Sequence, residues 1–191
     1  MAYLTADEIK SMGFKQLGEN ILLSNKASYY NCKNISIGNN VRVDDFCVLS
    51  AGEGGIEIGN FVHIAVYTLI IGSGKITFND FSGASSRVSI YSSNDDYSGS
   101  SLTNPMIPKE FADVNHSDVF IGRHVIIGSG SVILPGVNLH EGVAIGALSL
   151  VIENCEEFSI YAGNPAKKIK NRKRDLLEME GKFLSSLKQH K

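Results

Sequence analysis

The chain has 191 residues, 43% of them hydrophobic, and a formal net charge of -2. This length suits one domain with a core of ordinary size, and the balanced charge excludes an electrostatic preference for nucleic acid or anionic membranes. No stretch has the length and apolarity of a spanning helix or a signal peptide. Three cysteines, Cys32, Cys47 and Cys155, lack metal-ligand spacing. We therefore expect a cytoplasmic protein with reduced thiols and without membrane insertion.

The first expected element is a short helix in an N-terminal cap, residues 1–16. Thr5 with Glu8 three residues later forms a capping-box pattern, which predicts a helix that ends near Met12.

Residues 17–160 carry a six-residue repeat, which matches neither a helical period nor a strand period. In the stretch 121–151 an aliphatic residue occupies every sixth position: Ile121, Ile127, Ile133, Leu139, Ile145 and Val151. Four positions after each comes a smaller residue, such as Ser131 or Cys155. Two inward positions per six residues indicate a short strand and a corner, and three such units close one turn of a triangular solenoid.

The same register recurs earlier in the chain, and each occurrence predicts one turn. The sets are Ile37, Val43 and Leu49; Ile58, Ile64 and Ile70; and Phe78, Ala84 and Ile90. A weaker turn begins near Leu17, and the Gly-rich segments 51–55 and 72–75 are expected to bulge at corners. The predicted fold is therefore an all-β solenoid, a parallel β-helix of hexapeptide repeats.

The repeat stops after Ile90 and resumes at Ile121, which leaves residues 91–118 as a long inserted loop. The loop includes the sequence SNDDYSG and many polar turn formers. A loop of this length in a compact domain usually has a function.

Residues 161–191 are expected to form a tail with a basic run, KKIKNRKR at 167–174, and a helix with apolar residues between Leu176 and Leu187. Uncovered strand edges at the ends of a solenoid favour polymerisation, so we expect short helical caps at both ends.

The repeat at 121–151, followed by YAGNPAKKIKNRK at 161–173, resembles the left-handed β-helix hexapeptide acyltransferases, which take acyl groups from coenzyme A. The resemblance covers about residues 17–174. It implies a left-handed coil, against the usual right-handed crossover rule. It also implies a homotrimer with active sites between neighbouring coils, where loop 91–118 would form part of each wall.

Other segments, among them HIAVYT and SNDDYSG, are similar to sugar N-acyltransferases of the viosamine and anthrose type. The implied reaction transfers an acyl group, acetyl being expected, from acyl-CoA to the 4-amino group of a nucleotide-linked sugar such as dTDP-4-amino-4,6-dideoxyglucose. The product would serve surface polysaccharide biosynthesis. The implied co-substrate is acetyl-CoA, and no metal is expected.

The loop supplies two candidate catalytic residues. Relatives that acetylate galactosides carry a catalytic His-Pro pair where this chain has Asn94, Asp95 and Asp96. An amine acceptor needs help only to lose its ammonium proton, which a carboxylate can accept, so Asp95 and Asp96 favour an amino sugar. The alternative is that both only form an Asx turn.

Two further candidates lie on the coil. Glu141 is at an outward corner, in the half of the coil that the family uses for coenzyme and acceptor, although such a Glu is usually only solvated. His63 follows the inward Val62 and should face outward as a candidate general base, although a lone His is more often structural. His116 is a weaker candidate, and His124, His140 and His190 are expected to be structural.

Coenzyme A is expected at the basic tail and beside small side chains. Lys168, Lys170 and Arg172, after Asn164 of the signature, would surround the phosphates. Ser129 and Ala147 would flank the pantetheine arm, because small side chains allow close approach.

Three alternatives remain open to different degrees. An O-acetyltransferase of the same family would acylate a hydroxyl instead. A non-enzymatic solenoid for binding would leave the loop and the signature without a purpose. A zinc hydratase on the same coil needs three histidines at one metal, but His63 and His124 occupy different places in their six-residue units.

Overall fold

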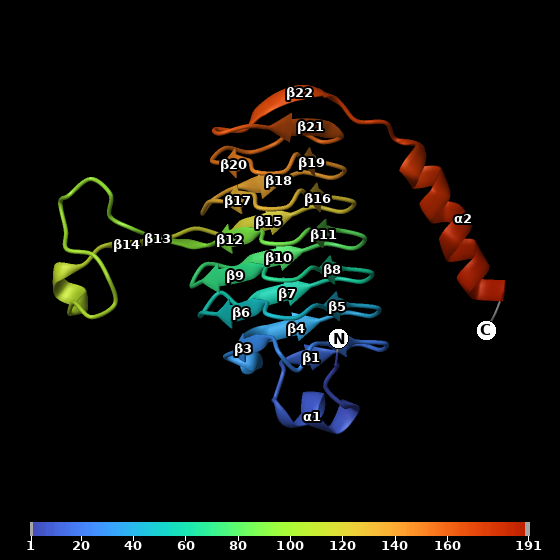
Figure 1. Ribbon diagram of the computed structural model, residues 1–191, viewed down its shortest axis with the longest axis horizontal. Helices are drawn as coiled ribbons and strands as arrows, with labels where there is room; N and C mark the ends of the chain where they lie inside the picture. The colour runs from blue at the N-terminus through green and yellow to red at the C-terminus, as the bar shows by residue number, and fades with distance from the viewer. Residues whose placement is uncertain (1, 190–191) are drawn as a thin grey trace.

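The computed structural model describes residues 2–189 as a parallel β-solenoid with three flat faces (Figure 1). Face 1 consists of β1 (Gln16–Leu17), β4 (Ile35–Ile37), β7 (Ile56–Ile58), β10 (Ile76–Phe78), β15 (Val119–Ile121) and β18 (Asn138–Leu139). Face 2 consists of β2 (Leu22–Leu23), β5 (Arg42–Val43), β8 (His63–Ile64), β11 (Gly83–Ala84), β16 (Ile126–Ile127), β19 (Ala144–Ile145), β21 (Ser159–Ala162) and β22 (Lys167–Asn171). Face 3 consists of β3 (Ser28–Tyr30), β6 (Val48–Ala51), β9 (Leu69–Gly72), β12 (Ser89–Tyr91), β17 (Val132–Ile133) and β20 (Leu150–Val151).

The six-residue repeat produces this stacking, because each large inward residue lies directly over its equivalent in the next turn. On face 1 the register pairs Ile58 with Phe78, Phe78 with Ile121, and Ile121 with Leu139. The large residues of the three sets and of the 121–151 run are all buried, and Cys47 and Cys155 are buried free cysteines. The predicted register and the weaker turn at Leu17 are confirmed.

Aromatic residues occupy one corner of the coil in an unusual backbone conformation. Phe61, Phe81 and His124, between faces 1 and 2, have φ of 56°, 59° and 58°, a left-handed region that bulky residues rarely adopt. Their rings stack, with centroids 4.8 Å apart for Phe61 and Phe81 and 5.3 Å apart for Phe81 and His124. We call these three residues the corner ladder; their stacking offsets the backbone strain.

The N-terminal helix α1 (Ala6–Ser11) forms as predicted and lies at the first end of the coil (Figure 1). The Thr5 hydroxyl accepts a hydrogen bond from the Glu8 N–H, and the Glu8 carboxylate accepts one from the Thr5 N–H at 2.7 Å. This reciprocal capping box stabilises a helix too short to be stable alone.

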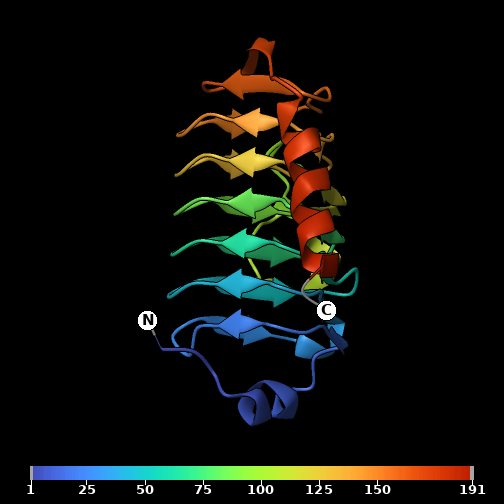
Figure 2. The same cartoon turned by 90° about the vertical axis from the view of Figure 1, so that its right-hand side faces the viewer.

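The C-terminal helix α2 (Asp175–Gln189) differs from the expected cap, because it runs along the flank of the coil (Figure 2). Phe183 packs edge-on against Phe61 and Phe81, and Glu180 binds the His124 Nε2 at 2.9 Å. The other end of the coil is covered by β22, which pairs antiparallel with β21. The helix therefore contacts the corner ladder through Phe183 and Glu180, and Phe183 remains 41% exposed. His190 lies outside the described residues.

The expected insertion leaves the coil after β12 as an antiparallel ribbon of β13 (Ser93–Asp95) and β14 (Val114–His116). A long loop, residues 96–113, connects the two strands and contains the short 3-10 helix η2 (Lys109–Phe111). We call residues 91–118 the arm. It projects from the side of the coil opposite α2 (Figures 1 and 2). No helix among residues 2–189 has the length and apolarity needed to cross a membrane.

Candidate active site

A groove of about 540 Å³ lies on face 2, next to the start of α2. Outward positions of face 2 align His63 with Gly83 and Gly83 with Ile126. Since Gly83 has no side chain, the space between His63 and Ile126 stays open, and Ser85 and Ser86 line its edge. We call this space the coil groove. A side chain at Gly83 would point outward into this space, because the neighbouring Ala84 points inward, and its Cβ would lie close to the His63 carbonyl oxygen, at 3.3 Å.

His63 is held by a buried carboxylate at the edge of the groove. Its Nε2 lies 2.9 Å from the Asp44 Oδ2, and the Arg42 Nε lies 2.7 Å from the other oxygen of Asp44. The Asp44 side chain is 7% exposed, whereas the His63 side chain is 51% exposed. His63 therefore faces outward, as predicted, with one ring nitrogen anchored and its ring partly in solvent.

Arg172 lies at the other end of the groove and contacts the coil. Its Nη1 donates to the carbonyl oxygens of His124 and Gly142, at 2.8 and 3.0 Å. Burial lowers the pKa of the Arg172 guanidinium. These bonds tie the chain after β22 to the corner between faces 1 and 2. The Nη1 of Arg172, a residue predicted to bind phosphate, therefore has a structural role.

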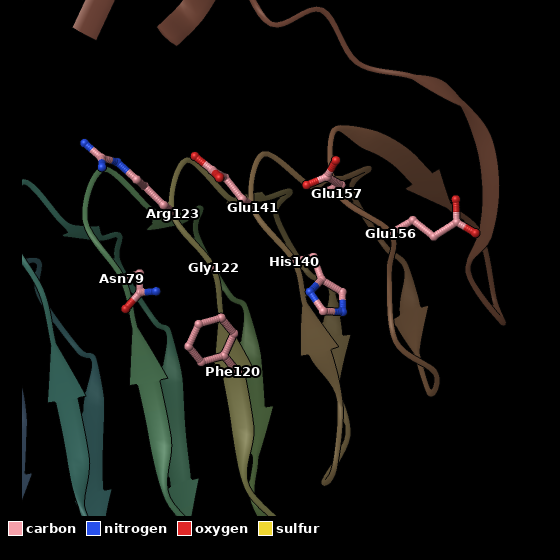
Figure 3. Close-up of a pocket in the computed structure, with 8 residues that line it drawn as sticks. All are labelled: Asn79, Phe120, Gly122, Arg123, His140, Glu141, Glu156 and Glu157. Atoms are coloured by element: carbon pink, nitrogen blue, oxygen red, sulfur yellow. The ribbon is translucent and has the colours of Figure 1, made fainter. Parts of the chain in front are cut away.

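A second pocket, of about 650 Å³, lies on face 1 near the same corner (Figure 3). It is lined by Asn79, Phe120, Gly122, Arg123, His140, Glu141, Glu156 and Glu157. Glu156 binds the Lys168 Nζ at 2.7 Å, which lowers the pKa of Glu156, and Glu157 binds Arg174 at 2.9 Å. The candidate Glu141 is half-buried in this pocket, where Arg123 and Glu157 are its neighbours (Figure 3). It does not line the coil groove that contains His63.

The other candidate coenzyme ligands lie towards the C-terminal end of the coil. Ser129 and Ala147 are exposed in successive turns at the corner between faces 2 and 3, where the Leu148 N–H donates to the Ser129 carbonyl at 2.9 Å. Asn164 is exposed in the turn between β21 and β22, before the cis Asn164-Pro165 bond. Lys168 and Lys170 are exposed on β22.

The two arm aspartates have different environments. The Asp96 carboxylate accepts hydrogen bonds from the backbone N–H groups of Ser98 and Ser101, at 2.7 and 2.8 Å. The Ser98 and Ser101 bonds also lower the pKa of Asp96. Asp96 therefore forms the Asx turn that was the alternative interpretation. Asp95 is exposed, and among the described residues its carboxylate has no hydrogen-bond or ion-pair partner.

The base of the arm is fixed to the coil by Ser93. Its hydroxyl accepts a hydrogen bond from the Ser73 N–H at 2.7 Å and lies 2.8 Å from the His116 Nδ1. His116 thus contacts the ribbon, and His124 stacks in the corner ladder. Within residues 2–189, no three His, Cys, Asp or Glu side chains are placed to hold a metal ion.

One chain does not bring all candidates together. His63 and Arg172 line the coil groove near α2, whereas Asp95 and Asp96 lie on the arm at the opposite side of the coil (Figures 1 and 2). Sequence reasoning missed Asp44 and Gly83. The repeat register could have revealed both, because it stacks Val43, Ile64 and Ala84 in successive turns. Asp44 directly follows Val43, and Gly83 directly precedes Ala84.

Comparisons with known proteins agree with this architecture. A dTDP-4-amino-4,6-dideoxy-D-glucose acyltransferase of Escherichia coli is 59% identical over 186 residues, which cover 97% of this chain and 97% of that protein. A putative lipopolysaccharide biosynthesis O-acetyltransferase of Escherichia coli strain K12 is 29% identical over 83% of this chain and 88% of its own length. No protein-family model matches the chain.

Among solved structures, AntD, an N-acyltransferase from Bacillus cereus in complex with dTDP and 3-hydroxybutyryl-CoA, has a TM-score of 0.91 and 45% identity, covering 97% of this chain and 98% of that chain. A variant of AntD in complex with dTDP-4-amino-4,6-dideoxyglucose and coenzyme A has the same TM-score of 0.91. The chain therefore belongs to the hexapeptide-repeat acyltransferases, in the group that includes the acyltransferases of dTDP-4-amino-4,6-dideoxyglucose.

Proposed function

We propose that this enzyme transfers an acyl group from acyl-CoA to the 4-amino group of dTDP-4-amino-4,6-dideoxyglucose. The observation that carries the proposal is the 59% identity with the Escherichia coli acyltransferase along 97% of both chains. The free Asp95 carboxylate on the arm supports an amine acceptor, because it can hold an ammonium group and accept its proton. The arm carries this carboxylate where relatives that acetylate galactosides carry a His-Pro pair, so the arm favours N-acylation over the O-acetyltransferase alternative.

We propose that the active enzyme is a homotrimer in which the arm of one copy reaches the coil groove of another. The arm exposes Tyr97, Met106 and Phe111 by 86%, 88% and 59%. Large apolar side chains with so little cover are typical of a protein interface. Asp95 and Asp96 of one copy would then meet His63 of the next, and Glu141 would contact the acceptor at the neighbouring corner.

We propose that coenzyme A runs along the corner between faces 2 and 3 to the groove. Lys168 and Lys170 would bind its phosphates near Asn164, while Arg172 fixes the tail that carries them. Ser129 and Ala147 would flank the pantetheine arm, because their exposed small side chains leave the backbone accessible. Acetyl-CoA is the proposed donor. CoA thioesters as donors, together with free buried thiols, favour a cytoplasmic enzyme, and the product would serve surface polysaccharide synthesis.

The reaction can be tested with purified protein, acetyl-CoA or 3-hydroxybutyryl-CoA, and dTDP-4-amino-4,6-dideoxyglucose or its 4-hydroxy analogue. Thiol release and product mass should show rapid acylation of the amine and much slower acylation of the hydroxyl. Equal turnover of both acceptors would support O-acyl transfer instead. Light scattering should give three chains per particle, and an active monomer would contradict the trimeric site.

A further inference from the structure

Asp44 is buried but has no role in the hydrophobic core. It directly follows the inward Val43 of β5, and it is 5% exposed. An ionised carboxylate at such a position is costly unless both oxygens are paired. Here the Arg42 Nε donates to Oδ1 at 2.7 Å, and the His63 Nε2 lies 2.9 Å from Oδ2. The arrangement therefore keeps a charged hydrogen-bond acceptor fixed next to His63. Among the described residues the coil groove has two histidines, and the other, His124, is bound to Glu180 of α2.

The chemistry of this contact determines the tautomer of His63. An ionised carboxylate can only accept a hydrogen bond, so the Nε2 of His63 must be the nitrogen that carries the proton. In the neutral imidazole the Nδ1 is then unprotonated and has a free lone pair. The His63 side chain is 51% exposed and lines the coil groove beside Gly83, and within residues 2–189 its Nδ1 has no hydrogen-bond partner.

We propose that Asp44 is a positioning residue that holds His63 in the Nε2–H tautomer, so that the His63 Nδ1 takes the proton released when the sugar amine attacks the thioester. The proposal rests on the proposed function, and it assigns the second of two proton transfers. The first converts the bound ammonium into an amine and belongs to Asp95 on the arm.

The second transfer occurs during bond formation. The amine nitrogen bonds to the thioester carbonyl carbon, its remaining extra proton passes to the Nδ1 of His63, and the C–S bond breaks with its electron pair on sulfur. The imidazolium then returns the proton to the thiolate, which leaves as CoA thiol. Asp44 stays ionised throughout and compensates the transient positive charge on the ring.

The test compares Asp44→Asn with a matched control, Asp45→Asn. Asp45 is the adjacent carboxylate, but it binds the Ser24 hydroxyl at 2.5 Å and Lys26 instead of His63. Asp44→Asn should lower kcat about 10²–10⁴-fold with little change in either KM, because the amide can stabilise the wrong tautomer. Asp45→Asn should keep kcat within about twofold, and thermal unfolding shows whether either variant is merely unstable.

A second readout is independent of activity. Two-bond ¹H–¹⁵N spectra of the imidazole nitrogens, recorded for the full chain at neutral pH, should show the Nε2–H form of His63 in the wild type. In Asp44→Asn the spectrum should shift towards the Nδ1–H form or a mixture. An unchanged tautomer, or an unchanged kcat, would overturn the proposal.

His63→Gln separates this inference from the proposed function. Loss of kcat with retained acyl-CoA binding supports the role of His63. If His63→Gln turns over the amino sugar like the wild type, His63 carries no proton and the inference fails, while the acyl transfer reaction itself stands. If the wild type does not acylate the amino sugar at all, the proposed function fails first.

Discussion

The coil and the arm of this protein use their apolar residues in opposite ways. In the coil, Ile70, Ile90 and Ile133 are stacked in register on face 3, each with 0% exposure. In the arm, Tyr97 and Met106 are 86% and 88% exposed, and the ribbon has only two strands. A two-stranded ribbon without a packed face is marginally stable in water. Stability is therefore concentrated in the repeat, and the arm can vary in sequence and chemistry without loss of the fold.

The sharpest test of this division is Asp95→Asn on the arm. It keeps the side-chain shape but removes the base, so kcat should fall by roughly 10²- to 10⁴-fold, while the free energy of unfolding stays within about 0.5 kcal/mol of the wild type. Steady-state kinetics and urea unfolding measure the two quantities. The control is Asp113→Asn, an exposed carboxylate elsewhere on the arm. An equal effect of both changes, or undiminished activity of an Asp95→Asn, Asp96→Asn double variant, would contradict the catalytic role of the arm.

The opposite result is expected in the coil. Ile133→Ala should lower the free energy of unfolding by about 2–5 kcal/mol, because it opens a cavity between Ile90 and Val151. The folded fraction should retain its kcat for the amino sugar. Ile152→Ala, at a position 46% exposed, is the matched control and should cost less than about 1 kcal/mol. Equal losses for the two variants would mean that the stacked core is not the main source of stability.

Arg172 tests whether the tail belongs to the stable part or to the binding part. Arg172→Ala leaves the carbonyl groups of His124 and Gly142 without their charged donor, so we expect a loss of about 1.5–3 kcal/mol in unfolding free energy. Lys170→Ala, on the exposed β22, should cost almost nothing. Hydrogen exchange would show increased opening of α2 in Arg172→Ala. Unchanged stability together with a raised KM for acyl-CoA would instead assign Arg172 to phosphate binding alone.

The smallest expected effect is at the two exposed lysines of β22. Changing Lys168 and Lys170 together to Ala should raise the KM for acetyl-CoA by about three- to tenfold, because each change removes only one solvent-exposed charge, whose attraction for phosphate is weakened by water and salt. The KM for the amino sugar should stay the same. The increase should shrink in high salt, since exposed charges are screened. A change confined to the sugar KM would move the coenzyme to another part of the surface.

Much of the coil could be predicted because its rule is local and repeated. Each inward residue, such as Ile64 or Ile127, is specified by the same six-residue interval, and errors in one unit would be visible in the next. The capping box of Thr5 and Glu8 is also local, and the helix begins where it predicts. The arm could be predicted as an insertion, because the interval is interrupted between Ile90 and Ile121.

The position of α2 could not be predicted in this way. The spacing of its apolar residues indicated a helix with one face packed against the rest of the protein, but not which surface it contacts. That surface is the corner ladder of Phe61, Phe81 and His124, whose rings meet only when successive turns stack. The ladder also depends on positive φ at aromatic residues, which no propensity favours. We expected a helical cap because strand edges at the C-terminal end of the solenoid would otherwise be exposed. In the structure β22 covers that end by pairing with β21, so no helix is needed there.

Residues close together in the chain were enough to reveal the repeat, its register, the interruption at the arm and the chemical types available for acyl transfer. Which of these residues meet depends on the tertiary structure. It placed Asp44 beneath His63 from the preceding turn, left Gly83 open beside them, assigned Asp96 to a turn and left Asp95 free. Contacts between turns depend on stacking about twenty residues apart, and side-chain direction at that distance is set by packing rather than by local pattern.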